Sequence, residues 1–315
     1  MDTHYKTIIK AIFDGRVVPF LGAGVNLLGR PADQEWRKGQ SAYLPSSSEL
    51  AMHLAENFGC PPDERNDLVR VSQYVATTAG FGPLYNTLHD LFAGDYPPTP
   101  VHRFFASLPA VLRTHGYPSR HQLIVTTNYD DLLERAFTAA NQPFDVVSYV
   151  AEGEHRGKFL HRPPAGEALL IERPNEYRGL SLEQRPVILK IHGAVDRDVP
   201  ERDSFVITED HYINFLTRTD ISNLIPVTLA AKLRKSHFLF LGYSLRDWNL
   251  RVILHRIWGE QKLVYKSWVI QASQQELDQK LWMQRDVEIL NVSLEDYLAE
   301  LNARVQGLLP SGGGS

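Results

Sequence analysis

The chain has 315 residues, of which 43% are hydrophobic, and its 33 basic and 37 acidic side chains give a formal net charge of −4. This length and apolar content can bury the core of one large domain or two moderate ones, and the charge argues against a broad nucleic-acid surface, so no direct nucleic-acid partner is expected. Cys60 is the single cysteine, which excludes an intrachain disulfide and a zinc cluster of several thiolates.

From the N-terminus onward, the first 15 residues lack the basic-then-apolar pattern of a leader, and no apolar run approaches the roughly 20 residues that span a bilayer. We therefore expect a cytoplasmic protein without a membrane partner. Six short stretches rich in Val, Ile, Leu and Phe are bounded by turn residues, which predicts buried strands. These stretches are residues 16–22, 122–128, 186–193, 237–243, 267–272 and 287–292.

Helix-like sequence follows several of these strands, at residues 129–140, 244–258 and 294–305. Within residues 204–216, a short strand pattern precedes a helix that we expect to begin at Thr208. Apolar strands that alternate with helices predict a parallel sheet covered on both faces. The predicted fold class is therefore α/β, a doubly wound, Rossmann-like parallel sheet whose ligand lies at the carboxyl ends of the strands.

Two longer stretches interrupt the alternation of strands and helices. Residues 31–100 contain helical patterns separated by Pro/Gly-rich breaks, whereas residues 145–185 are mixed, polar and loop-like. We expect both to be inserts in a single domain of residues 1–310, forming a smaller, mostly helical lobe over the crevice. Residues 311–315, "SGGGS", have the composition of a flexible linker or tag remnant.

The first strand ends in Gly22-Ala23-Gly24, with Asn26 close behind. Two glycines at a strand end let backbone amides approach an anion, and a following helix would add the partial positive charge of its N-terminus, which suits a diphosphate. The third glycine of the usual dinucleotide fingerprint is absent, because Leu27 stands there. On this motif alone, a plain structural turn is an equal alternative.

Three further strand ends carry polar groups. The second predicted strand delivers Thr126, Thr127, Asn128 and Asp130, although helix capping is an alternative role for the last two. The third delivers His192 beside Gly193, a place poorly suited to simple core packing, although a single histidine is more often structural. The fourth ends in Gly242, Tyr243 and Ser244.

The order of these motifs resembles the sirtuin family, and most closely the sirtuin-like NAD-consuming enzymes of bacterial anti-phage defence. The pattern is Gly-Ala-Gly, then Thr-x-Asn-x-Asp, then His-Gly, then Gly-x-Ser-Leu, each at a strand end, and the resemblance covers residues 11–30, 98–137 and 186–295. It implies that the first motif cradles the NAD diphosphate, the second contacts the nicotinamide ribose and carboxamide, the third supplies a base and the fourth holds the adenosine half. His102, in the matching segment before the second strand, is expected to be structural.

Carried over by position, the resemblance implies two catalytic residues, Asn128 and His192. It also implicates Gly22, Ala23, Gly24, Asp130, Gly242 and Ser244 in cofactor binding. The polar and small residues beside them at the same strand ends are expected to bind the cofactor as well: Asn26, Thr126, Thr127, Gly193 and Tyr243.

The sequence also departs from the family pattern. The four-cysteine zinc module that follows the histidine motif in protein-deacylating sirtuins is absent, so no zinc is expected. Thr127 replaces the usual glutamine, residues 30–36 differ from the family's cofactor loop, and the strand at 267–272 lacks an Asn-x-Glu, which leaves Gln271 as a candidate for ribose contact. Acyl-lysine chemistry is therefore disfavoured.

The leading hypothesis is an NAD⁺ glycohydrolase that uses NAD⁺ as its substrate, releases nicotinamide and ADP-ribose, and depletes NAD in anti-phage defence. Nicotinamide leaves as a neutral ring, so the oxocarbenium-like reaction needs no general acid. A neutral His192 can act as base and Asn128 can orient water or a ribose hydroxyl.

Two alternatives use the same cofactor. One is a protein deacylase or ADP-ribosyltransferase, and the other is a noncatalytic NAD or ADP-ribose sensor, for which Asn128 or His192 would be expected to be replaced. Because an unrestrained NAD hydrolase would be toxic, we also expect a homo-oligomer or an activating protein partner of the defence system to control it.

Overall fold

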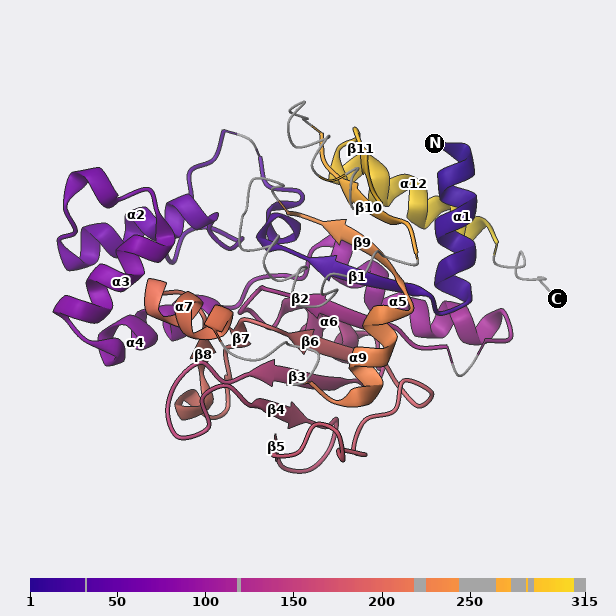
Figure 1. Ribbon diagram of the computed structural model, residues 1–315. Coiled ribbons are helices and arrows are strands. Elements are labelled where there is room, and N and C mark those ends of the chain that lie inside the picture. Colours follow the sequence, from indigo (N-terminus) through magenta and orange to yellow (C-terminus); the bar gives the residue numbers. More distant parts are fainter. Residues whose placement is uncertain are drawn as a thin grey trace.

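The computed structural model describes residues 1–31, 33–117, 120–217, 225–243, 265–272, 282 and 286–308. Within them, a nine-stranded sheet runs through the molecule in the order β11-β10-β9-β1-β2-β6-β3-β4-β5 (Figure 1). Its strands are β1 (Val17–Leu21), β2 (Leu123–Thr126), β3 (Asp145–Tyr149), β4 (Phe159–Arg162), β5 (Leu169–Ile171), β6 (Val187–Lys190), β9 (His237–Leu241), β10 (Ser267–Ile270) and β11 (Val287–Leu290). The strands from β11 to β3 are mutually parallel, and β4 and β5 extend the edge in antiparallel fashion.

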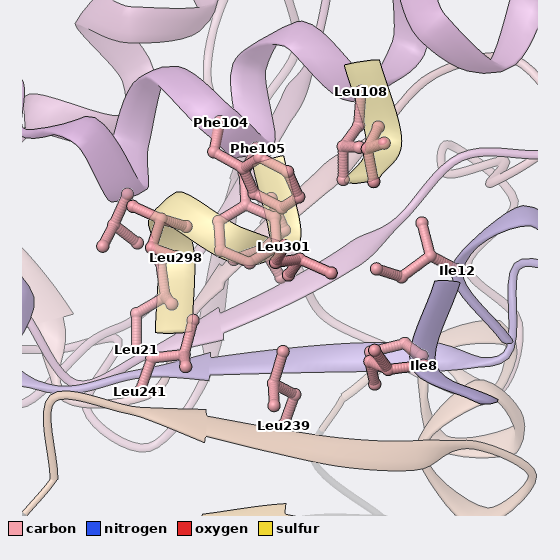
Figure 2. Packing of buried hydrophobic residues seen from close by; sticks show 14 of the residues in the cluster. Ile8, Ile12, Leu21, Phe104, Phe105, Leu108, Leu239, Leu241, Leu298 and Leu301 are labelled. Atoms are coloured by element: carbon pink, nitrogen blue, oxygen red, sulfur yellow. The ribbon is translucent and has the colours of Figure 1, made fainter. Parts of the chain in front are cut away.

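Helices cover both faces of this sheet. On one face lie α1 (Asp2–Phe13), α5 (Pro100–Thr114), α6 (Leu132–Ala139) and α12 (Leu294–Gly307), and on the other α7 (Glu209–Thr217) and α9 (Val227–Arg234). Figure 2 shows the first face, where Ile8 of α1, Phe105 of α5 and Leu301 of α12 converge on Leu239 of β9. Because the parallel strands are covered on both sides, they are apolar along their whole length. The predicted doubly wound α/β fold and all six predicted strands are confirmed.

The expectation for residues 145–185 as a loop-like insert is wrong, because β3, β4 and β5 lie there and join the main sheet. Polar residues in these strands interrupt the apolar pattern by which buried strands are predicted from sequence. Asp145 of β3 is fully buried, and its carboxylate accepts from His161 Nε2 of β4 at 2.8 Å and from Arg185 Nε at 2.7 Å. The Asp145 carboxylate is therefore paired near the edge of the sheet, although a charged residue in the sequence suggested an exposed loop.

Residues 31–100 do form helices, α2 (Ser47–Phe58), α3 (Leu68–Thr78) and α4 (Phe81–Phe92). They have a separate apolar cluster that also includes Leu132, Val195 and Phe205 of the sheet side. In Figure 1 these helices lie beyond the arrowheads of β1 and β3, at the carboxyl edge of the sheet. A cavity lies between them and the strand ends.

Two short elements complete this edge. The helix expected directly after Gly24 is only a five-residue 3₁₀-helix, η1 (Ala23–Leu27), after which the chain turns extended at Leu28 and left-handed at Gly29. The strand expected before Thr208 is β8 (Ser204–Phe205), paired with β7 (Gly193–Ala194), and the Thr208 hydroxyl accepts from the His211 amide at the start of α7. Among the described helices, none has the length and apolar character to cross a membrane.

Candidate active site

A cavity of about 600 Å³ lies between the carboxyl ends of the parallel strands and the helices α2 to α4. The sheet contributes the turn after β1, the segment after β2, His192 after β6, the turn after β9 and the end of β10. The opposite wall contains Ser46, Leu50, Leu68 and Phe92 of the helical segment. This location at the strand ends is where a doubly wound fold binds its ligand.

The cavity gathers most of the residues expected to form the site. Those lining it are Ala23, Gly24, Asn26, Thr127, Asn128, Asp130, His192, Gly242 and Tyr243, together with Gln271. Three others, Gly22, Thr126 and Gly193, do not line it, and Ser244 lies outside the described residues. The four strand-end motifs therefore converge, although their distance in sequence exceeds 200 residues between the first and the last.

The Gly-Ala-Gly turn packs directly against the end of β9. The Gly22 amide donates to the Leu241 carbonyl and the Gly24 amide to the Gly242 carbonyl, both at 2.9 Å. A Cβ atom on Gly24 would lie 2.8 Å from the Gly242 oxygen, so only glycine permits this approach. The Gly22 and Gly24 amides therefore already have acceptors in this arrangement, and the binding of a diphosphate at this turn stays a prediction.

Asp130 is buried at the floor of the cavity and organises its neighbours. Its carboxylate accepts from Asn26 Nδ2 at 2.7 Å and from the Leu132 amide at 3.1 Å, so it also holds the first turn of α6. Lys190, buried on β6, donates to the Asp130 carbonyl and pairs with Glu134 at 2.9 Å. Burial raises the pKa of Asp130, which the nearby lysine charge and these hydrogen bonds oppose.

Asn128 is held in place from two sides. Its backbone amide donates to Thr126 Oγ1 at 3.0 Å, and that hydroxyl donates to the Leu21 carbonyl at 2.8 Å, so the Thr126 side chain connects the ends of β1 and β2. The Asn128 side chain donates from Nδ2 to the Gly22 carbonyl at 3.2 Å. The second motif is thereby bonded to the first, and the Asn128 amide group is fixed at the cavity wall.

His192 is the most unusual group of the cavity. The residue is 4% exposed, and its ring has edge contacts with Tyr212 and Phe215, with ring centroids at 5.5 Å in both pairs. Nε2 is buried and has no hydrogen-bond partner among the protein groups that the structure describes. Burial lowers the pKa of His192 to about 3, so the imidazole is neutral at physiological pH.

Tyr212 lines the cavity and was missed in the sequence. It lies on α7 three residues before Phe215, and this spacing places both rings on one face of the helix. The predicted helix start at Thr208 could therefore have indicated an aromatic wall, but nothing local connects that wall to His192.

The helix α7 also links the helical segment to His192. Gln73 of α3 donates to the Asp210 carboxylate at 2.9 Å and accepts from the Asp210 amide at 3.1 Å. His211 lies 5.3 Å from the ring of Phe81 of α4 and pairs with Glu152 at 2.9 Å. These contacts connect α3 and α4 through α7 to the rings that contact His192.

The buried histidines predict a loss of stability in acid. His102, which closes a capping box with Thr99 at the start of α5 and is structural as expected, resembles His192 in that burial lowers its pKa from 6.5 to about 3. Above pH 6.5 the two histidines are neutral in the native and in the unfolded protein. As the pH falls below 6.5, the unfolded chain binds two protons that the native state rejects, so the free energy of unfolding should fall by up to about 3 kcal/mol per pH unit.

Urea unfolding followed by circular dichroism between pH 7.5 and 4.5 measures this slope. A His102→Gln variant should lose the share of this slope that His102 contributes, about 1.4 kcal/mol per pH unit. Equal unfolding free energies at pH 7 and pH 5 would contradict the neutral burial of these rings.

Comparison with known families matches residues 122–290 to the family model of the SIR2-like domain. The chain is 29% identical over 254 residues to the NAD(+) hydrolase ThsA of Acinetobacter baumannii (strain 532279), covering 79% of this chain and 41% of that protein. It is 28% identical to the NAD(+) hydrolase ThsA of Enterococcus faecium, covering 80% and 42%, and 25% identical to the defense-associated sirtuin 2 of Bacillus subtilis, covering 82% and 21%. The chain thus spans less than half the length of these relatives.

Proposed function

The chain belongs to the family of SIR2-like domains, and from this premise we propose that it is an NAD⁺ glycohydrolase that acts on cytoplasmic NAD⁺ in anti-phage defence. The observation that carries the proposal is the neutral, buried His192, whose Nε2 has no hydrogen-bond partner among the described residues, in one cavity with the fixed amide of Asn128. The names of the relatives, two NAD(+) hydrolases and a defense-associated sirtuin, agree with this activity.

The proposed reaction needs a base and a neutral amide, which His192 and Asn128 supply. The bond between the ribose C1′ and the pyridinium nitrogen breaks, its electron pair neutralises the ring, and nicotinamide departs. The oxygen of a water molecule bonds to C1′ and its proton passes to His192, which yields ADP-ribose. Asn128 contributes a neutral amide that orients the water or a ribose hydroxyl without adding charge near the developing cation.

The experiment that tests this function is an assay of nicotinamide release from NAD⁺ by the purified chain, without an acyl peptide. We expect equimolar nicotinamide and ADP-ribose. Release that requires an acyl-lysine peptide would indicate the deacylase instead, and transfer of ADP-ribose to protein would indicate the transferase. Tight binding of NAD⁺ with no product under any of these conditions would identify a sensor and contradict the proposal.

The activity is expected to be independent of metal. Among the residues that the structure describes, no three His, Cys, Asp or Glu side chains are grouped so as to hold a metal ion. The purified protein should therefore contain well under one equivalent of zinc by elemental analysis, and EDTA should leave nicotinamide release unchanged. One tightly bound equivalent whose removal abolishes the activity would overturn this expectation.

We further propose that the hydrolase is controlled by homo-oligomerisation or by an activating protein partner, acting on the helical insert at residues 31–100. The contacts of Gln73 with Asp210 and of Phe81 with His211 support this route, because they connect the insert through α7 to His192. Light scattering and nicotinamide release over a dilution series test it, with an expected rise in rate per subunit on assembly. A monomer with full, concentration-independent activity and no response to a partner would exclude this control.

A further inference from the structure

A second cavity, of about 470 Å³, lies at the edge of the sheet opposite the candidate active site. It opens where β1, β2 and β9 begin, between the end of α1 and the last turns of α9. Four cationic side chains line it, together with two carboxylates. The cations are Arg16, Arg120, Lys232 and Lys235, and the carboxylates are Asp14 and Glu183.

Two of these cations converge on one point of the backbone. Lys232 of α9 is half-buried, and its ammonium donates to the Gly15 carbonyl. A Cβ atom placed on Gly15 would lie 3.6 Å from Arg120 Cδ and 3.8 Å from Lys232 Nζ, so both side chains meet over the same glycine. Burial and then the charge of Arg120 lower the pKa of Lys232.

A capping role explains only part of this arrangement. Gly15 follows the C-terminus of α1, where a cation is stabilised by the helix dipole and by free carbonyl groups. Lys232 alone satisfies that requirement. A second cation beside it raises the electrostatic cost of a half-buried ammonium, and among the described residues none of the four cations lies in an ion pair with Asp14 or Glu183.

We propose that this second cavity binds a small phosphate monoester, up to the size of a mononucleotide, between Arg120 and Lys232. A phosphate dianion would supply the missing counter-charge, because guanidinium groups bind phosphate through paired N–H donors and ammonium groups bind it as point charges. The cavity volume is in the range of small-molecule sites. Four cations and two carboxylates leave a formal charge of +2 around it, which matches a dianion better than a nucleic-acid chain.

The walls of the cavity fit the rest of such a ligand. Ser181 and Thr228 place hydroxyl groups at its lining, and Leu180 and Leu182 add an apolar side. A base or another apolar group attached to the phosphate would contact these leucines. We therefore expect a phosphate monoester with an apolar body to bind more tightly than inorganic phosphate.

Calorimetric titration of the whole chain with AMP and with inorganic phosphate tests the proposal. AMP should bind in an additional event that persists when NAD⁺ analogues saturate the candidate active site, and it should bind more tightly than phosphate. Arg120→Gln, a change at an exposed side chain, and Lys232→Met should each weaken AMP by about tenfold or more, since each removes a charge-assisted bond. Lys158→Met, which removes an exposed lysine paired with Glu172 at 2.9 Å, is the matched control and should leave AMP binding unchanged.

If neither AMP nor inorganic phosphate binds to this cavity at millimolar concentration, the proposal is overturned. So would an AMP affinity that is the same in Arg120→Gln, Lys232→Met and the parent chain, once circular dichroism shows that all three are folded. Equal affinities for AMP and phosphate would refute the role of the apolar wall. Because every readout is binding, these results do not depend on whether the chain hydrolyses NAD⁺.

Discussion

Replacing His192 with alanine is expected to lower the rate of NAD⁺ hydrolysis by about 10²- to 10⁴-fold, the usual contribution of a general base. The fold should survive this change. Val187, Ile188 and Leu189 of β6 remain buried in the sheet, and the imidazole Nε2 has no protein hydrogen bond to lose among the described residues. What disappears is a neutral base held against Tyr212 and Phe215.

The matched control is His102→Ala. His102 is as deeply buried as His192 and has its pKa lowered to about 3 by the same cause, but it lies in the capping box of α5 and does not line the cavity. His102→Ala should therefore lose stability and keep its rate of nicotinamide release. A folded His192→Ala protein that releases nicotinamide at the parent rate would remove His192 from the mechanism.

The pH dependence gives a second readout for the same residue. With a pKa of about 3 in the free protein, His192 stays deprotonated far below its ordinary range, so kcat/KM should show no loss of activity with an apparent pKa near 6.5. Tyr212→Ala would open the ring to water and should move the acid limb upward toward 6.5. If kcat/KM of the parent chain already falls in acid with an apparent pKa of about 6.5, the base is exposed to water when it acts.

Sequence patterns were sufficient for the parallel centre of the fold because those strands are buried on both faces and therefore apolar throughout. Val17 to Leu21 of β1 and Phe238 to Leu241 of β9 are examples. They failed at β3, β4 and β5, where Asp145 and His161 occupy buried positions as a hydrogen-bonded pair. A pattern of single residues does not reveal that two polar groups satisfy each other across neighbouring strands.

For the candidate site, too, some features could be predicted from the sequence and others could not. Strand-end residues such as Thr127, Asn128 and His192 were identifiable because the carboxyl ends of parallel strands meet at one edge. The hydrogen bond of the Gly24 amide could not be predicted, because its acceptor is the carbonyl of Gly242, which is more than 200 residues away in the chain. Roles that depend on a long-range partner need the structure, whereas positions that depend on strand direction do not.

Replacing Asn128 with alanine is expected to lower turnover by tenfold or more while changing NAD⁺ affinity less. The reason is positional, since the amide is fixed at the wall beside the proposed base, whereas the turns after β1 and β9 form other parts of the cavity. The change also leaves the Gly22 carbonyl without its donor from Nδ2, at a cost of about 1–3 kcal/mol in stability, so the folded fraction must be measured first.

Single-turnover nicotinamide release and calorimetric NAD⁺ affinity, measured on the same sample, separate the two effects. Gln122→Ala is the matched control, because it removes another buried amide from the opposite end of the segment that contains β2, outside the cavity, and should leave both quantities unchanged. If Asn128→Ala instead loses most of its affinity and keeps its single-turnover rate at saturating NAD⁺, then Asn128 binds the substrate without orienting the attack. His192 would in that case act on a nucleophile positioned by another group of the cavity wall.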